Sequence, residues 1–247
     1  MTPNTQWLLI DQGNTAIKWR MADASGLRAE GGVVESVEAL RAALAASDWG
    51  TVGLSSVGSD ETCSSLTEML SAMSVAPVFT ASSERACGGL RNSYAEPERM
   101  GVDRWLAMLA ARDAVEGAFC VIDAGTAVTV DIVTAEGQHE GGYILPGPEL
   151  MCRALTSDTG RIRAEAGLAP DLAPGQSTAD CVNAGVWRAA CAGVQSVMAD
   201  HPEHRAVVTG GGAVGLLTLG VTADFHPDLV LYGLWVWLSK ALDDQSA

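Results

Sequence analysis

The sequence predicts an α/β protein built from two related halves, and two observations lead to this expectation. The first is a pattern that occurs twice, at residues 7–20 and again at residues 119–131: an apolar run, Asp-x-Gly, a threonine and a second apolar run. Each copy is typical of a strand, a tight glycine turn and a second strand. The second observation is that helix-like and strand-like segments alternate along the chain, which favours a layered α/β fold.

The repeated pattern also indicates chemistry. Glycine lets the backbone come close to a ligand, and successive backbone N–H groups in such a turn can form an anion site. The carboxylates of Asp11 and Asp123, which end the first strand of each copy, only accept hydrogen bonds and therefore suit a magnesium ion or its waters. Two related hairpins about half a chain apart are expected to face each other across a nucleotide cleft. The alternative is a pair of ordinary hairpins in which Asp and Asn only favour the turn.

The other elements are expected from apolar spacing and from breaks at glycine and proline. The chain is expected to divide into domains 1–115 and 116–247, with the final helix packing back toward the first domain. Helices are expected at 36–46, 61–73, 98–115, 149–155, 177–199 and 229–242, strands at 51–57, 76–80, 138–145 and 206–208, and a polar loop at 156–177.

Composition limits the possible partners. The chain has 247 residues, is 48% hydrophobic and carries a formal net charge of −15, with no dense stripe of lysine and arginine. A nucleic-acid backbone would be repelled by this charge, so no nucleic-acid partner is expected. The longest apolar run, residues 229–238, is too short to span a bilayer, and the N-terminal residues lead us to expect no signal peptide. The six cysteines and four histidines complete no zinc or CxxC spacing. A cytoplasmic chain without a membrane partner is therefore expected.

Two further motifs carry chemistry. Residues 209–213 follow a strand and contain three consecutive glycines, which would let the backbone approach a nucleotide, although the segment is neither a P-loop nor GxGxxG. Asp103 and Arg104 follow a glycine at the start of a helix, where they could offer a proton acceptor and a carboxylate clamp together. The alternative is that Asp103 only complements the helix dipole and Arg104 is a solvated charge.

Together these motifs resemble the type III pantothenate kinases, also called the Bvg accessory factor family, over nearly the whole chain. Two positions depart from the family pattern: Gln12 replaces a usual apolar residue, and Gly212 stands where an acidic residue is common, which bears on nucleotide contacts. The segments that carry the resemblance are 11–15 with Lys18, 92–94, 101–104, 123–131, 141–147 with Leu150, Met151, Ala154 and Leu155, 177–178 and 209–211.

The resemblance implies an actin-like fold of the acetate and sugar kinase/Hsc70/actin superfamily, with two ribonuclease-H-like domains. It implies the ATP-dependent phosphorylation of pantothenate to 4′-phosphopantothenate, the first step of coenzyme A biosynthesis. It further implies a homodimer, and K⁺ or NH₄⁺ in addition to Mg²⁺.

The resemblance also implies a role for individual residues. Asp103 would be the proton acceptor, Asp123 would bind the monovalent cation, and Asp11 would face the magnesium of ATP. The implied ATP contacts are Asp11, Gln12, Gly13, Asn14, Thr15, Ala16, Ile17, Lys18 and Thr126. The implied pantothenate contacts are Tyr94, Gly101, Val102, Asp103, Arg104 and Thr178.

These residue types fit phosphoryl transfer on their own terms, because that reaction needs positioning and charge neutralisation more than covalent help. Lys18 would offset phosphate charge, and the planar guanidinium of Arg104 suits a carboxylate. Two alternatives remain open at this point. One is an actin-like kinase for a sugar or acetate, against which residues 101–104 and Tyr94 argue. The other is a non-enzymatic nucleotide-binding regulatory factor, against which the presence of Asp11 and Asp103 argues.

Overall fold

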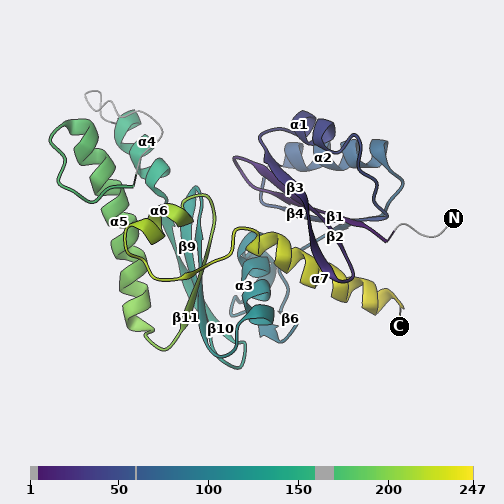
Figure 1. Ribbon diagram of the computed structural model, residues 1–247. Helices are drawn as coiled ribbons and strands as arrows, with labels where there is room; N and C mark the ends of the chain where they lie inside the picture. Colours follow the sequence, from purple (N-terminus) through teal and green to yellow (C-terminus); the bar gives the residue numbers. More distant parts are fainter. Residues whose placement is uncertain (1–4, 59, 159–169, 247) are drawn as a thin grey trace. The chain divides into compact units, whose positions relative to one another are not determined.

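The computed structural model describes residues 5–58, 60–158 and 170–246 (Figure 1). The chain forms two compact units. The first comprises Met1–Ala114 together with Asp228–Ala247, and the second comprises Val115–Pro227. Each unit is built on a five-stranded sheet with helices packed against it.

The first sheet has the strand order β3-β2-β1-β4-β5. Its first three strands form an antiparallel meander, and β4 and β5 then run parallel to β1. The strands are β1 (Trp7–Gln12), β2 (Ile17–Asp23), β3 (Gly26–Val34), β4 (Thr51–Ser56) and β5 (Val78–Thr80). The expected hairpin at residues 7–20 is therefore confirmed as β1 and β2.

The second sheet repeats this plan with the order β10-β9-β8-β11-β12. It again starts with an antiparallel meander and continues with two parallel strands. The strands are β8 (Phe119–Ala124), β9 (Ala127–Val133), β10 (His139–Pro146), β11 (Arg205–Thr209) and β12 (Asp224–Phe225). Two sheets of identical order and pairing confirm the duplication expected from the repeated hairpin.

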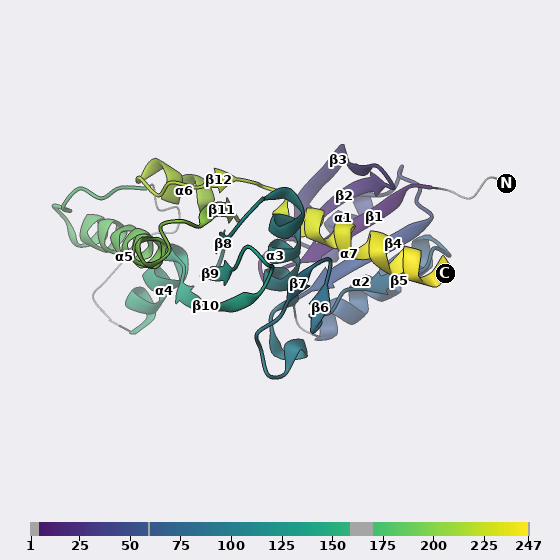
Figure 2. The same ribbon diagram turned by 90° about the horizontal axis from the view of Figure 1, so that it is seen from below.

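Helices cover both faces of the first sheet. One face carries α1 (Val37–Ala43) and α2 (Asp60–Met73), and the other carries α3 (Val102–Ala114) and α7 (Leu229–Ser246) (Figures 1 and 2). Side-chain alternation along β1 explains the division. Leu8 and Ile10 share a core with Leu40, Leu66 and Leu70 of α1 and α2.

The opposite face of the first sheet packs on α7. Gly53 of β4 has no side chain, and the space beside it is occupied by Leu9 of β1 and by Leu234 and Leu238 of α7. The helix is also tied to the meander by polar contacts. The Trp235 Nε1 donates to the Asp23 carbonyl at 2.7 Å, and the Arg20 Nη2 lies 2.6 Å from the Asp228 Oδ2. The C-terminal segment therefore packs within the first unit.

Among the described residues of the second unit there are three helices, of which α5 is the longest. They are α4 (Pro148–Asp158), α5 (Thr178–Asp200) and α6 (Ala213–Thr218). Of the expected loop 156–177, residues 156–158 instead end α4, and residues 159–169 lie outside the described residues. In the part of the chain that the structure describes, no helix combines the length and apolar character needed to cross a membrane.

All six cysteines are unpaired. Cys120, on β8, is fully buried. Burial and, to a smaller extent, the Asp131 carboxylate raise the pKa of this thiol to about 11. Because the thiolate is the reactive form, Cys120 is inert near neutral pH and serves to fill the core.

Candidate active site

The first feature of the site is a buried carboxylate at the end of β1. Asp11 lies opposite Lys18 of β2 and beside Ser55 of β4 in the register of the sheet. Side chains at paired positions lie on the same face of a sheet. The Ser55 Oγ donates to the Asp11 Oδ1 at 3.1 Å, and both residues are buried. The sheet register therefore fixes the Asp11 carboxylate beside the Lys18 position.

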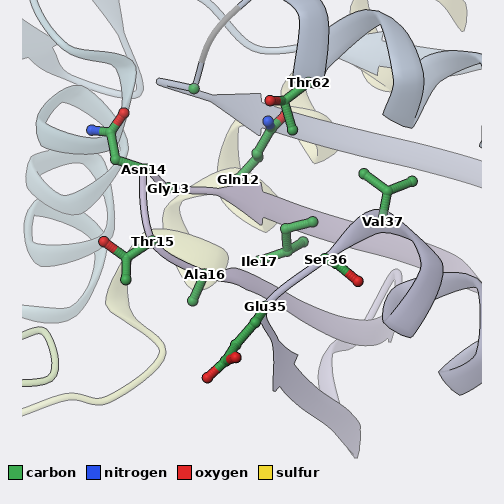
Figure 3. Close-up of a pocket in the computed structure, with 11 residues that line it drawn as sticks. Gln12, Gly13, Asn14, Thr15, Ala16, Ile17, Glu35, Ser36, Val37 and Thr62 are labelled. Atoms are coloured by element: carbon green, nitrogen blue, oxygen red, sulfur yellow. The ribbon is translucent and has the colours of Figure 1, made fainter.

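A tight turn joins β1 to β2. The Gly13 N–H donates to the Ala16 carbonyl at 3.0 Å, and Asn14 and Thr15 at the tip of the turn are exposed. Figure 3 shows the Asn14 and Thr15 side chains at this tip, directed away from the strands. The predicted residues Asp11 to Lys18 thus form one hairpin, with exposed polar side chains and backbone at its turn.

A cavity of about 300 Å³ lies beside this hairpin, on the face that α1 and α2 cover. Gln12 shares this face with Leu8 and Ile10, because side chains alternate along β1. Its Oε1 accepts from the Ser56 Oγ at 3.1 Å, and its side chain extends toward Thr62 (Figure 3). The cavity is lined by Gln12, Gly13, Asn14, Thr15, Ala16, Ile17, Glu35, Ser36, Val37, Gly58 and Thr62. Gln12 and Asp11 therefore point to opposite faces of the sheet.

The start of α3 brings the second predicted motif to the carboxyl edge of the first sheet. The Ser83 Oγ donates to the Met100 carbonyl at 2.9 Å, and Ser83 lies three residues beyond the end of β5. The parallel strands β1, β4 and β5 all end at this edge. Since α3 also packs on α7, Asp103 at its first turn lies at the same edge and on the same face as Asp11.

The local geometry at this helix start depends on Gly101. The Asp103 Oδ1 accepts from the Arg104 N–H at 2.8 Å, which turns the carboxylate toward the beginning of the helix. A Cβ built on Gly101 would lie 2.6 Å from that oxygen. Any other residue at position 101 would therefore displace the Asp103 carboxylate.

The structure also brings Tyr94 and Arg104 together. Arg104 is 6% exposed, and its Nη1 donates to the Tyr94 hydroxyl at 3.0 Å. Its guanidinium carbon lies 5.9 Å from the centroid of the Tyr94 ring, within the range of a cation–π contact. Tyr94 lies in an irregular loop and Arg104 lies in α3, so this contact joins that loop to the helix.

Two residues hold the backbone of that loop. The Asn92 Oδ1 accepts from the Tyr94 N–H at 2.9 Å, and the Arg85 Nη1 donates to the Tyr94 carbonyl at 2.8 Å. Asn92 is buried and belongs to the Asn-Ser-Tyr motif of the sequence. Arg85 was missed by sequence reasoning, because a single arginine in an irregular segment gives no local signal of its partner.

The second hairpin is in close contact with the glycine motif at residues 209–211. Asp123 is the last residue but one of β8 and pairs in register with Thr129 and Thr209. Gly210 has a φ of +91°, and a Cβ there would lie 2.5 Å from both the Asp123 Oδ1 and the Ala124 carbonyl oxygen. The predicted glycine motif at 209–211 therefore lies beside the second hairpin, and only glycine fits at position 210.

Two further residues that the sequence analysis expected to bind substrates lie in the second unit. Thr126 lies exposed in the turn between β8 and β9, and its carbonyl accepts from the Gly147 N–H at 3.0 Å. Thr178 begins α5, where the Ser177 Oγ caps the helix by accepting from the Asp180 N–H at 3.2 Å. This confirms the expected cap with Asp at the third position. Thr178 also lines an apolar groove of about 650 Å³ formed with α4.

No cluster of three or more His, Cys, Asp or Glu side chains with the geometry of a metal site occurs among the described residues. Magnesium does not require one, because it commonly binds through one or two carboxylates together with substrate phosphates. The buried Asp11 carboxylate, aligned by Ser55, is a hard oxygen ligand of the type that such a site uses.

A family model described as Type III pantothenate kinase matches residues 7–200. The chain belongs to this family. It is 42% identical over 234 residues to the type III pantothenate kinase of Marinobacter nauticus, which covers 92% of this chain and 96% of that protein. It is 37% identical over 225 residues to the type III pantothenate kinase of Hahella chejuensis, covering 91% and 94% respectively.

Solved structures with the same fold agree with the predicted fold class. A conserved Baf family protein from Campylobacter jejuni has a TM-score of 0.62 at 18% identity, covering 96% of this chain and 99% of that one. The activator of 2-hydroxyisocaproyl-CoA dehydratase from Clostridium difficile, with bound ADPNP, has a TM-score of 0.54 at 11% identity, covering 98% and 97%. At these identities the likeness concerns the fold alone. The expected actin-like fold of the acetate and sugar kinase superfamily is confirmed.

Proposed function

We propose that this chain transfers the γ-phosphoryl group of ATP to pantothenate, giving 4′-phosphopantothenate and ADP. The observation that carries the proposal is the placement of Asp103 and Arg104 at the same edge and face of the first sheet as Asp11 and Lys18. Membership of the type III pantothenate kinase family supports the choice of acceptor. This reaction is the first step of coenzyme A biosynthesis.

On the nucleotide side, the hairpin from Asp11 to Lys18 would bind ATP. Its backbone N–H groups and the Thr15 hydroxyl supply donors, and Lys18 supplies positive charge. Asp11 would hold the magnesium of ATP, which when bound neutralises charge on the phosphates. Thr126 of the second hairpin is proposed as a further ATP contact.

On the acceptor side, Asp103 would accept the proton of the pantothenate hydroxyl as its oxygen forms a bond to the γ-phosphorus. The bond from that phosphorus to the bridging oxygen of ADP breaks in the same transfer. Arg104 would bind the pantothenate carboxylate, and the Tyr94 hydroxyl bonded to it would set its orientation. Gly101 and Val102 at the helix start and Thr178 of α5 are the other proposed pantothenate contacts.

A monovalent cation, K⁺ or NH₄⁺, is proposed at Asp123. The support is chemical: the Asp123 Oδ1 and the Ala124 carbonyl oxygen both lie beside Gly210, and oxygen ligands of this kind suit a large, weakly hydrated cation. When bound, the cation would reduce charge repulsion among the phosphates.

The reaction is proposed to take place in the cytoplasm. The six unpaired cysteines support this, because thiols persist in a reducing compartment.

A homodimer is also proposed. Exposed apolar side chains occur on α4 and on the adjoining strand β10: Leu150 and Leu155 are exposed on the helix, and Tyr143 of β10 is 49% exposed. They adjoin the apolar groove between α4 and α5. Contiguous exposed apolar surface of this kind marks association sites.

The proposed reaction is tested by following ADP release from ATP with a panel of acceptors: pantothenate, pantothenyl alcohol, acetate and a hexose. Release that depends on pantothenate is expected, with formation of a phosphomonoester visible by phosphorus NMR. Release with the hexose or acetate instead would assign the chain to a different kinase activity. Nucleotide binding without any transfer would favour the regulatory alternative.

Replacing Asp103 with Asn should lower kcat by roughly 10²–10⁴-fold, the usual contribution of a general base. The substitution keeps the shape of the side chain, so ATP binding should persist and is measured by calorimetric titration. Turnover near that of the unchanged protein would show that Asp103 is not the proton acceptor.

Replacing Arg104 with Lys keeps the charge but removes the planar fork, so the KM for pantothenate should rise about tenfold or more. The contact with Tyr94 should weaken at the same time. Steady-state assays compare pantothenate with pantothenyl alcohol. If the variant still prefers the carboxylate as strongly as the unchanged protein does, Arg104 has another role.

Replacing Asp123 with Asn should reduce both activity and its response to potassium. Sodium is smaller and more strongly hydrated, so it should substitute poorly for potassium in the unchanged protein. The measurement is a titration of each chloride salt at constant ionic strength. Equal rates in both salts, unaltered by the substitution, would make Asp123 a structural residue of the turn.

Replacing Leu155 with Glu places a charge in the apolar surface and should shift the protein from dimer to monomer in sedimentation velocity. Val75, which is fully exposed in the first unit, offers the matched control: Val75→Glu should leave the mass unchanged. A monomeric parent protein would contradict the proposed homodimer.

A further inference from the structure

Helix α7 crosses α3 at an unusually close contact. Gly233 lies inside α7, and a Cβ built there would overlap the carbonyl group of Leu106 in α3. Glycine weakens a helix interior, so its presence there calls for a packing reason. The absence of a side chain allows the two helix backbones to touch. The atoms that a Cβ at Gly233 would meet belong to the Leu106 backbone, which cannot move aside as a flexible side chain could.

The crossing point lies close to the chemistry. Leu106 comes three residues after Asp103, which is about one turn along the same helix. Trp105 and Leu106 are fully buried, and Arg104 is nearly so. Because a helix moves as a stiff rod over one turn, a displacement of Leu106 carries the Asp103 and Arg104 backbone with it.

Helix α7 also holds the far end of α3. The Tyr232 hydroxyl donates to the Asp113 Oδ2 at 2.6 Å, and this bond, followed by burial, raises the pKa of Tyr232 to about 12. The phenol therefore stays protonated and keeps donating throughout the neutral range. Gly233 and Tyr232 are neighbours on α7, so one short stretch of that helix contacts α3 at two places.

The loop that carries Tyr94 is anchored on the same helix. The Trp237 Nε1 donates to the Glu84 Oε1 at 2.6 Å, at the beginning of the segment that leads to Tyr94. Further along that segment, Gly88 faces Lys240 of α7 and Leu109 of α3, either of which a Cβ at Gly88 would approach to 2.9 Å. Both components of the proposed acceptor site thus rest on α7.

We infer that α7 is the positioning element of the acceptor site, and that Gly233 and Tyr232 set the location of Asp103 and Arg104 through α3. The inference rests on the proposed function for the roles of Asp103 and Arg104. Neither Gly233 nor Tyr232 contacts substrate in this scheme, so both are positioning residues. The competing interpretation is that α7 contributes packing stability only.

The experiment compares Gly233→Ala with Leu238→Ala. Leu238 lies on the same helix but packs beside Gly53 of the sheet, so its truncation destabilises the first unit without pushing on α3. Each variant is measured for thermal stability, for pantothenate kcat and KM, and for the dissociation constant of a non-hydrolysable ATP analogue in the absence of pantothenate.

Gly233→Ala should lower kcat/KM for pantothenate roughly 10²-fold, the scale expected for a displacement of about 1 Å at a reacting group. Its dissociation constant for the ATP analogue should stay within about twofold, because the β1–β2 hairpin is untouched. Leu238→Ala should lose thermal stability and retain its pantothenate constants. Unchanged pantothenate constants in Gly233→Ala, or an equal loss in Leu238→Ala, would overturn the inference.

Tyr232→Phe decides the case if Gly233→Ala does not fold. It removes one hydroxyl and should raise the KM for pantothenate about threefold or more while ATP-analogue binding is retained; an unchanged KM would overturn the inference. The unchanged protein is assayed first. Failure of its pantothenate-dependent ADP release contradicts the proposed function, whereas normal release by the parent and by both variants contradicts only the role of α7.

Discussion

The register between β1 and β4 is the constraint on which the first half of the site depends. It pairs Asp11 with Ser55 and, one residue further, Gln12 with Ser56. Each pair is joined by a hydroxyl that donates at 3.1 Å, but the two pairs point to opposite faces of the sheet. A slip of one residue would exchange the faces. The carboxylate would then enter the core of α1 and α2, and the amide would take its place beside α3.

Because of this separation, the two faces of the first sheet differ in function. The α1 and α2 side is mainly an apolar core, with the polar cavity at its edge next to Gln12. The α3 and α7 side gathers Asp11, the Lys18 position and the start of α3 at the carboxyl edge. Ligands in α/β sheets typically bind outside the carboxyl ends of the strands, and here the chemistry-bearing side chains meet at that edge. The cavity next to Gln12 belongs to the other side.

Much of this arrangement was predictable because local signals and tertiary structure agree. The two hairpins were found from glycine turns between alternating apolar runs, and their duplication predicted two sheets of one plan. Helix α3 begins at Val102 rather than at 98, because Pro97 opens a short 3₁₀ turn and Met100 is extended. Strand β3 was missed because it is an edge strand with three glycines and many exposed side chains, so its apolar alternation is weak.

Other parts of the site could not be predicted from the sequence. The bond between Arg104 and Tyr94 and the support from Arg85 join segments of different conformation, with no periodicity to relate them. Gly233 gives only the general signal of a glycine within a helix. Its partner is the backbone of Leu106, more than a hundred residues away, and only the packed structure identifies it.

The most direct measurement is a crystal structure of the protein with magnesium, a non-hydrolysable ATP analogue and pantothenate. The expected result places the pantothenate hydroxyl within roughly 3–3.5 Å of both the Asp103 carboxylate and the γ-phosphorus, as a near-attack geometry requires. Its carboxylate should lie against Arg104. Pantothenate bound instead on the α1 and α2 face, in the cavity beside Gln12 and Thr62, would contradict the assignment of the site.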